Sequence, residues 1–212
     1  RKLIEWYVHQ IEKSDVKLFL NTEVDAAFIE ANSPDVVIIA TGSTEIRIPV
    51  PGADGANVVM VAEAARKKVK LGERVAIIGG GLSGCELGAQ LVLEGKKVTM
   101  VEMMPKLMAT KKNPVAMSIN PLIARLKDGG ADIMTSTKLK AITDGAINVE
   151  RGGEEQRVEA DTVVMAAGFR PNNELYKQLK DYAGEVYIIG DAEGVDDVFH
   201  AIWGGFDLGK GI

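Results

Sequence analysis

Three glycines and one acid in this chain have the types and the spacing of a dinucleotide-binding turn. An apolar strand at 74–78 runs into the pattern G-x-G-x-x-G, which occupies Gly79, Gly80, Gly81, Leu82, Ser83 and Gly84. The first glycine of such a pattern permits a tight turn, the second leaves room for a pyrophosphate, and the third lets the following helix pack closely on the strand. The helix start offers unpaired amides and a positive dipole end to the phosphates. The run therefore predicts a nucleotide site built mainly from backbone.

The acid is Glu102, which ends the next apolar strand, 97–102. It follows Gly84 by about the 20 residues expected of the ribose-binding acid in a dinucleotide site. A carboxylate there accepts hydrogen bonds from the ribose hydroxyls and repels the 2′-phosphate of NADP. Met103 and the two residues after it supply no arginine to reverse that preference, whereas Lys106 weakens it. We expect NAD(H) as the cofactor, and the strictness of its preference over NADP(H) stays open.

Composition narrows the class of protein. Hydrophobic residues make up 46% of the 212 residues, charged residues make up 26%, and the net charge of −5 with scattered basic residues argues against a nucleic-acid partner. Apolar runs such as 36–40 are far shorter than the roughly 20 residues of a membrane span, so we expect no membrane partner. The single cysteine, Cys85, excludes an internal disulfide and a C-x-x-C redox pair. Because nothing resembles a signal peptide, we expect a cytoplasmic protein.

The elements that must position these groups alternate along the chain. Apolar periodicity and breaker residues predict helices at 1–13, 62–68, 85–95, 115–127 (with Pro121 inside), 173–180 and 198–209. The same signals predict strands at 16–20, 36–40, 74–78, 97–102, 131–135, 139–143, 147–149, 162–166 and 186–189. About 70 residues thus precede the glycine turn, although a dinucleotide fold normally opens with it.

Two similar strand ends, 38–42 and 164–168, each run into a turn of small residues where backbone can approach a ligand. We therefore expect an inner unit, 70–172, inserted into an outer one made of residues 1–60 and 180–212. The expected fold class is α/β, with a Rossmann-like three-layer dinucleotide-binding domain inserted in a truncated second one.

This layout resembles the two-dinucleotide-binding-domain flavoproteins of the pyridine nucleotide–disulfide oxidoreductase superfamily. The matching segments are 40–42, 79–84 with Glu102, 167–172 and 189–191. In that family an FAD domain is interrupted by an NAD(P)H domain. The resemblance implies that Gly190 and Asp191 close the FAD site and that Thr41 and Gly42 mark the crossing between the domains. Together with the glycine turn, Glu102 and Met103, the implied cofactor-binding residues are Thr41, Gly42, Gly168, Gly190 and Asp191.

Within the superfamily, the chain is most similar to the C-terminal region of NADH:flavin oxidoreductases of the 2,4-dienoyl-CoA reductase and trimethylamine dehydrogenase type. Such enzymes carry FMN and a [4Fe–4S] cluster in an N-terminal barrel that reduces an activated C=C bond or a related substrate. Nothing of that barrel, and no second glycine fingerprint, is in this sequence, and the chain starts at Arg1. We expect a fragment, inactive alone, that binds NADH but holds FAD weakly or not at all.

The implied chemistry is hydride transfer from C4 of NADH to N5 of a flavin, which needs stacked rings and no acid–base side chain. We therefore expect no catalytic residue in this chain. His9 and His200 are expected at the surface, and no metal site is expected. Two alternatives remain open, namely a non-catalytic nucleotide-sensing domain and a fragment of a ferredoxin- or rubredoxin-type NADH reductase. Unpaired sheet edges in the outer unit leave a homo-oligomer open as well.

Overall fold

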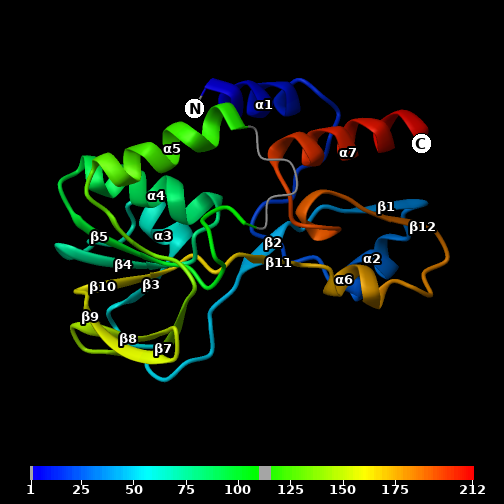
Figure 1. Cartoon of the computed structure of the whole chain (residues 1–212). Coiled ribbons are helices and arrows are strands. Elements are labelled where there is room, and N and C mark those ends of the chain that lie inside the picture. Colours follow the sequence, from blue (N-terminus) through cyan, green and yellow to red (C-terminus); the bar gives the residue numbers. More distant parts are fainter. Residues whose placement is uncertain (1, 110–115) are drawn as a thin grey trace.

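Apolar strands of β-branched residues build the centre of the molecule, and the computed structural model describes residues 2–109 and 116–212. Five parallel strands pair in the order β3-β10-β4-β5-β6 (Figure 1). Their bounds are β3 Val58–Met60, β4 Arg74–Ile78, β5 Lys97–Val101, β6 Asp132–Met134 and β10 Thr162–Met165. Strands covered on both faces read as continuous apolar runs, and β4 and β10 are such strands.

Two different layers cover the two faces of this sheet. On one face lie the helices α3 (Val61–Ala65), α4 (Leu82–Leu93) and α5 (Ala116–Asp128); on the other lies an antiparallel sheet of β7 (Thr137–Thr143), β8 (Ala146–Arg151) and β9 (Glu154–Glu159) (Figure 1). Strand β4 divides its side chains accordingly: Val75 and Ile77 belong to the helix-side core, and Ala76 and Ile78 to the other. The fold is α/β with three layers, as predicted.

A smaller, separate core lies beside these layers. Strands β1 (Val36–Ile39) and β12 (Glu185–Ile188) form a parallel two-stranded sheet, and α2 (Ala26–Asn32) and α6 (Glu174–Gln178) lie next to it (Figure 1). Val37 and Ile39 pack there against Ile29 and Leu179. A 3-10 turn, η1 (Gly190–Ala192), follows β12. Helices α1 (Lys2–Glu12) and α7 (Val198–Gly211) contribute no buried residue within the described chain.

The chain crosses between the two cores at two places, and the crossings pair with each other. Strand β2 (Ser43–Glu45) runs antiparallel to β11 (Phe169–Pro171), with Thr44 opposite Arg170 (Figure 1). The backbone N–H of Asn172 donates to the Gly42 carbonyl at 2.9 Å, and that of Ile46 donates to the Gly168 carbonyl at 2.9 Å. The crossings therefore form a two-stranded ribbon.

Several expected elements differ from the structure. The strand predicted at 16–20 is wrong: these residues form no strand in the described chain, and Leu20 is 70% exposed, because no neighbouring strand supplies hydrogen bonds. Strand β3, which the expected boundary at residue 60 assigns to the outer unit, pairs with β10 in the main sheet. Strands β2, β3, β9 and β11 were not anticipated, because they are short or polar. Helix α5 continues through Pro121, and its expected start at 115 lies outside the described residues.

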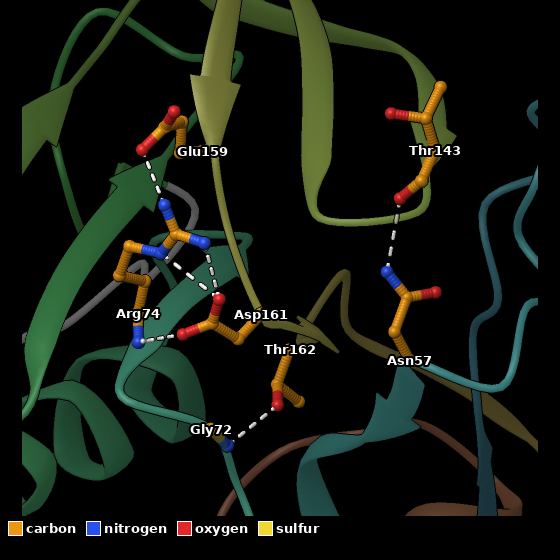
Figure 2. Close-up of polar contacts among 7 residues, drawn as sticks. All are labelled: Asn57, Gly72, Arg74, Thr143, Glu159, Asp161 and Thr162. Atoms are coloured by element: carbon orange, nitrogen blue, oxygen red, sulfur yellow. Dashed lines mark hydrogen bonds and ion pairs between the residues drawn. The ribbon is translucent and has the colours of Figure 1, made fainter.

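Polar groups tie together the edge of the main sheet where β4 begins. The Asp161 carboxylate accepts the Arg74 backbone N–H at 2.8 Å and its Nε at 3.0 Å, and Glu159 pairs with the same guanidinium (Figure 2). Gly72 donates its N–H to Thr162 Oγ1 at 2.9 Å (Figure 2). The hydrogen bonds from Arg74 lower the pKa of Asp161 from 3.8 to about 2. Ionised Asp161, just before β10, thus links the start of β10 to Arg74 at the start of β4.

The stability of the chain is expected to depend on the ionisation of Asp161. Because its pKa is lower in the folded state, the contribution is fully present above about pH 4 and is lost as the pH falls towards 2. Urea unfolding between pH 2 and 6 should show a smaller loss of stability over this window for Asp161→Asn than for the unaltered chain. Asp144→Asn, at an exposed turn, is the control and should leave the pH dependence as it is. Equal pH profiles for Asp161→Asn and the unaltered chain would contradict this account.

Candidate nucleotide-binding site

The glycine turn joins the end of β4 to the start of α4, and each glycine meets a different steric demand. Gly79 has φ +115°, and a Cβ on it would lie 2.1 Å from the Ala166 carbonyl oxygen. A Cβ on Gly84 would lie 2.2 Å from the Gly79 carbonyl oxygen, so this glycine sets the close packing of helix on strand. At Gly81 no atom of the described residues lies within 4 Å of the Cβ position. Gly79 and Gly84 thus meet the steric demands that the spacing predicts, and the space at Gly81 is open. A pyrophosphate in that space stays a prediction.

The open space faces the start of a helix. Gly81 is the N-cap of α4, and no side chain of the described residues makes a capping hydrogen bond there. The first amides of an α-helix have no partner within the helix, and they carry the positive end of its dipole. Leu82, Ser83 and Gly84 supply these amides. The arrangement suits a phosphate-bearing ligand.

Glu102 is held beside this turn by backbone. Its Oε2 accepts the Gly80 N–H at 2.6 Å and its Oε1 accepts the Met104 N–H at 2.6 Å. The Gly80 carbonyl in turn accepts the Met108 N–H at 2.8 Å, so the loop after β5 folds back onto the turn. Each carboxylate oxygen retains lone-pair capacity for further donors. Two backbone amides therefore hold the Glu102 carboxylate in place. The spacing in the sequence does not reveal these two hydrogen bonds.

Two residues near the turn differ sharply in exposure. Met103 follows Glu102 directly and is 66% exposed. Cys85 is fully buried on the first turn of α4, and burial raises the pKa of its thiol to about 11, with smaller contributions from Glu102 and Glu86. A thiol that stays protonated is unreactive, so Cys85 acts as a packing residue.

The second group of predicted residues lies at the outer core. Gly42 and Gly190 have φ +71° and +61°, and both line a cavity of about 350 Å³ together with Asp191. Thr41 does not line it; its Oγ1 donates to the Asn172 carbonyl at 2.5 Å. Gly168, with φ +101°, lies on the ribbon. The structure thus separates the predicted residues into the turn, the cavity and the ribbon between them.

The cavity carries an unusual charge. Asp191, Asp196 and Asp197 all line it, and no lysine or arginine of the described chain does. Carboxylates accept hydrogen bonds from hydroxyl groups but repel a diphosphate. The described lining therefore offers acceptors for hydroxyl groups and no cation for a diphosphate.

Both histidines lie at the surface, with side chains 58% exposed at His9 and 63% at His200. Asp196, Asp197 and His200 place ligand atoms within 4.8 Å of one another, and all three are exposed. Asp197 is the N-cap of α7 and accepts the His200 N–H at 3.2 Å, so helix capping accounts for this grouping. The absence of a metal site stays a prediction.

Known proteins resemble this chain over most of its length. Residues 1–201 match the family model described as pyridine nucleotide-disulphide oxidoreductase. The chain is 31% identical over its full length to a cinnamate reductase of Clostridium sporogenes and 32% identical over 96% of its length to an NADH oxidase of Thermoanaerobacter brockii. A solved structure of 2-naphthoyl-CoA reductase with 2-naphthoyl-CoA covers 99% of the chain at 32% identity, with a TM-score of 0.85. In each case the chain spans 32% of the relative's length.

A histamine dehydrogenase structure from Rhizobium at 21% identity and TM-score 0.78 adds support for the fold alone. Within the described residues, none of the helices has the length and apolar character needed to cross a membrane.

Alanine substitutions at Gly84 and Gly81 should differ in their effect on the free energy of unfolding, because only Gly84 is closely packed. Gly84→Ala forces a Cβ against the Gly79 carbonyl and should lower the free energy of unfolding by about 1–3 kcal/mol, the usual cost of overpacking. Gly81→Ala adds its Cβ to open space, and its cost should stay below about 1 kcal/mol, the usual penalty of alanine at an N-cap. Urea unfolding of the two variants tests the contrast, and equal losses would rule out the close approach at Gly84.

Proposed function

The chain belongs to the pyridine nucleotide-disulphide oxidoreductase family, and we propose that it is the NADH-binding module of a longer flavin-dependent oxidoreductase. As a member of this family it is a pyridine nucleotide-dependent flavoprotein oxidoreductase module. The finer assignment is carried by Glu102, an acid held by two backbone amides beside an open phosphate-binding turn. Such an acid accepts the ribose hydroxyls of NADH and repels the 2′-phosphate of NADPH.

In the proposed mechanism, this chain binds and orients while the cofactors carry the chemistry. NADH and a flavin bound together supply hydride transfer from nicotinamide C4 to flavin N5. The amides at the start of α4 hold the dinucleotide phosphates, and Glu102 fixes the adenosine ribose. Asp191 accepts a hydroxyl of the flavin chain, and the β2–β11 ribbon sets the approach of one unit to the other. No side chain of this module takes or gives a proton in that scheme.

The partner that completes the enzyme is proposed to be an N-terminal barrel domain with FMN and a [4Fe–4S] cluster. The chain covers about a third of relatives whose names specify a cinnamate reductase and a 2-naphthoyl-CoA reductase. These names support, as substrate of the longer enzyme, an unsaturated compound that accepts a hydride. The barrel would reduce that substrate with electrons that this module receives from NADH.

Nucleotide preference should follow the Glu102 carboxylate. The unaltered chain is expected to bind NADH at least tenfold more tightly than NADPH, and Glu102→Ala should reduce that ratio to within about threefold, because the repulsion of the 2′-phosphate is lost. Calorimetric titration of both nucleotides measures this. Glu23→Ala, a matched change at an exposed position, should leave the ratio alone. Absence of NADH binding would refute the proposed function.

Flavin binding should be limited by the acids around the outer cavity. The purified chain is expected to be colourless and to bind FAD at least a hundredfold more weakly than NADH, since no cation of the described lining meets the diphosphate. Asp196→Asn removes one repelling charge and should strengthen FAD binding severalfold, more at low ionic strength than at high. Flavin fluorescence quenching gives both values. A yellow protein with tightly bound FAD would contradict the expectation.

A further inference from the structure

Strand β2 is fastened by side chains to both units of the molecule. The Ser43 hydroxyl donates to Asp191 Oδ2 at 2.9 Å across 148 positions of sequence, in a half-buried setting. Two residues further along, Glu45 Oε1 accepts the Ala62 N–H at the start of α3 at 2.8 Å. Side chains two apart on a strand point to the same face. One face of β2 therefore contacts both units: Ser43 binds Asp191 at the outer cavity, and Glu45 binds the start of α3 in the inner unit.

The opposite face of β2 makes a contact of a different kind. Thr44 lies between Ser43 and Glu45, and its Oγ1 accepts a hydrogen bond from Arg170 Nε at 3.1 Å. That contact stays within the ribbon, since Thr44 pairs with Arg170 in the β2–β11 register. Thr44 thus offers a neighbouring hydroxyl that stiffens the ribbon without touching the cavity.

Asp191 is held by donors from two separate segments. Ser43 binds its Oδ2, and the Asp196 N–H lies 3.3 Å from its Oδ1. The residue lies on the η1 turn and lines the cavity with Gly42 and Gly190. The contact with the Asp196 amide is long for a hydrogen bond, so the Ser43 hydroxyl is the stronger restraint on the carboxylate.

We propose that Ser43 is a positioning residue: it holds the Asp191 carboxylate at the outer cavity and thereby couples the orientation of the nucleotide-binding unit to the flavin side of the module. This inference rests on the proposed function, because it takes a flavin hydroxyl as a further donor to Asp191. Loss of the Ser43 hydroxyl frees the carboxylate to rotate and removes the side-chain tie between β2 and the outer cavity, while the backbone bond from Asn172 to Gly42 remains. The nucleotide turn, with its own contacts, is unaffected.

The test compares variants of the full chain in FAD titrations carried to millimolar concentration, with NADH titrated into the same samples. Ser43→Ala should weaken FAD binding about tenfold, the effect of one charge-assisted hydrogen bond. Ser43→Thr keeps a hydroxyl and should restore binding, and Thr44→Ala should stay within twofold of the unaltered chain. In an Asp191→Ala background, Ser43→Ala should have no further effect, because the two act as one unit. NADH affinity should be the same throughout.

A second measurement follows the orientation of the units without any flavin. Spin labels at Asp144→Cys and Lys180→Cys report the distance between the units, and the buried Cys85 does not compete for the label. Ser43→Ala should broaden the distance distribution, whereas Thr44→Ala should not. Unchanged FAD affinity and an unchanged distribution would overturn the proposal, as would an undiminished effect of Ser43→Ala in the Asp191→Ala background or no FAD binding at all. Failure of the proposed function is a separate result, namely loss of NADH binding by the unaltered chain.

Discussion

The close approach of the glycine turn to the end of β10 is the constraint on which the site depends. Gly79 donates its N–H to the Val101 carbonyl, and Ala166 donates to the Ile78 carbonyl, both at 2.8 Å. The end of β4 is therefore held from both neighbouring strands. Gly79 has φ +115° and no room for a Cβ, so only glycine lets the chain turn here directly into α4. This fixes one edge of the sheet, where the loops after β4, β5 and β10 meet, the usual place for a ligand in an open α/β sheet.

The two cores differ in the charged groups that surround their candidate ligand sites. Beside the glycine turn, one acid is held by backbone amides, and the start of α4 has no side-chain cap among the described residues, so this region suits a phosphate-bearing ligand. At the outer cavity, three acids lie together without a basic residue among the described lining, so their carboxylates offer acceptors for hydroxyl groups. The nucleotide-binding core is also complete in its three layers, whereas the outer core rests on a two-stranded sheet. Its helices α1 and α7 expose apolar side chains such as Trp6 and Trp203. The two cores therefore differ both in the charge of their surroundings and in the size of their sheets.

The ribbon between the cores also makes side-chain hydrogen bonds to both of them. Its strands are short, yet Ser43 and Glu45 tie β2 to Asp191 and to α3. Because each tie is a hydrogen bond to a carboxylate, it is stronger than a neutral one. Side chains therefore join the two units at the ribbon alongside the backbone pairing.

Features that depend on local geometry can be read from the sequence alone. The glycine pattern requires a particular turn at Gly79 and Gly84, and apolar periodicity placed β4, α4 and β5 correctly. The α/β class and the family likewise followed from motifs that lie in continuous segments. These signals are readable because neighbouring residues share one conformation.

The tertiary structure alone decided which segments pair. Residues 16–20 have the composition of a strand but pair with no strand among residues 2–109 and 116–212, whereas the short β3 pairs with β10. The hydrogen bond from Gly80 to Glu102 joins residues 22 positions apart, and the one from Ser43 to Asp191 joins residues 148 positions apart. Such contacts leave no periodic trace in a sequence, since either partner satisfies its local preferences equally well without the other. Local residue types therefore set the geometry of the turn, and the packing of distant segments sets how that turn and the outer cavity are held.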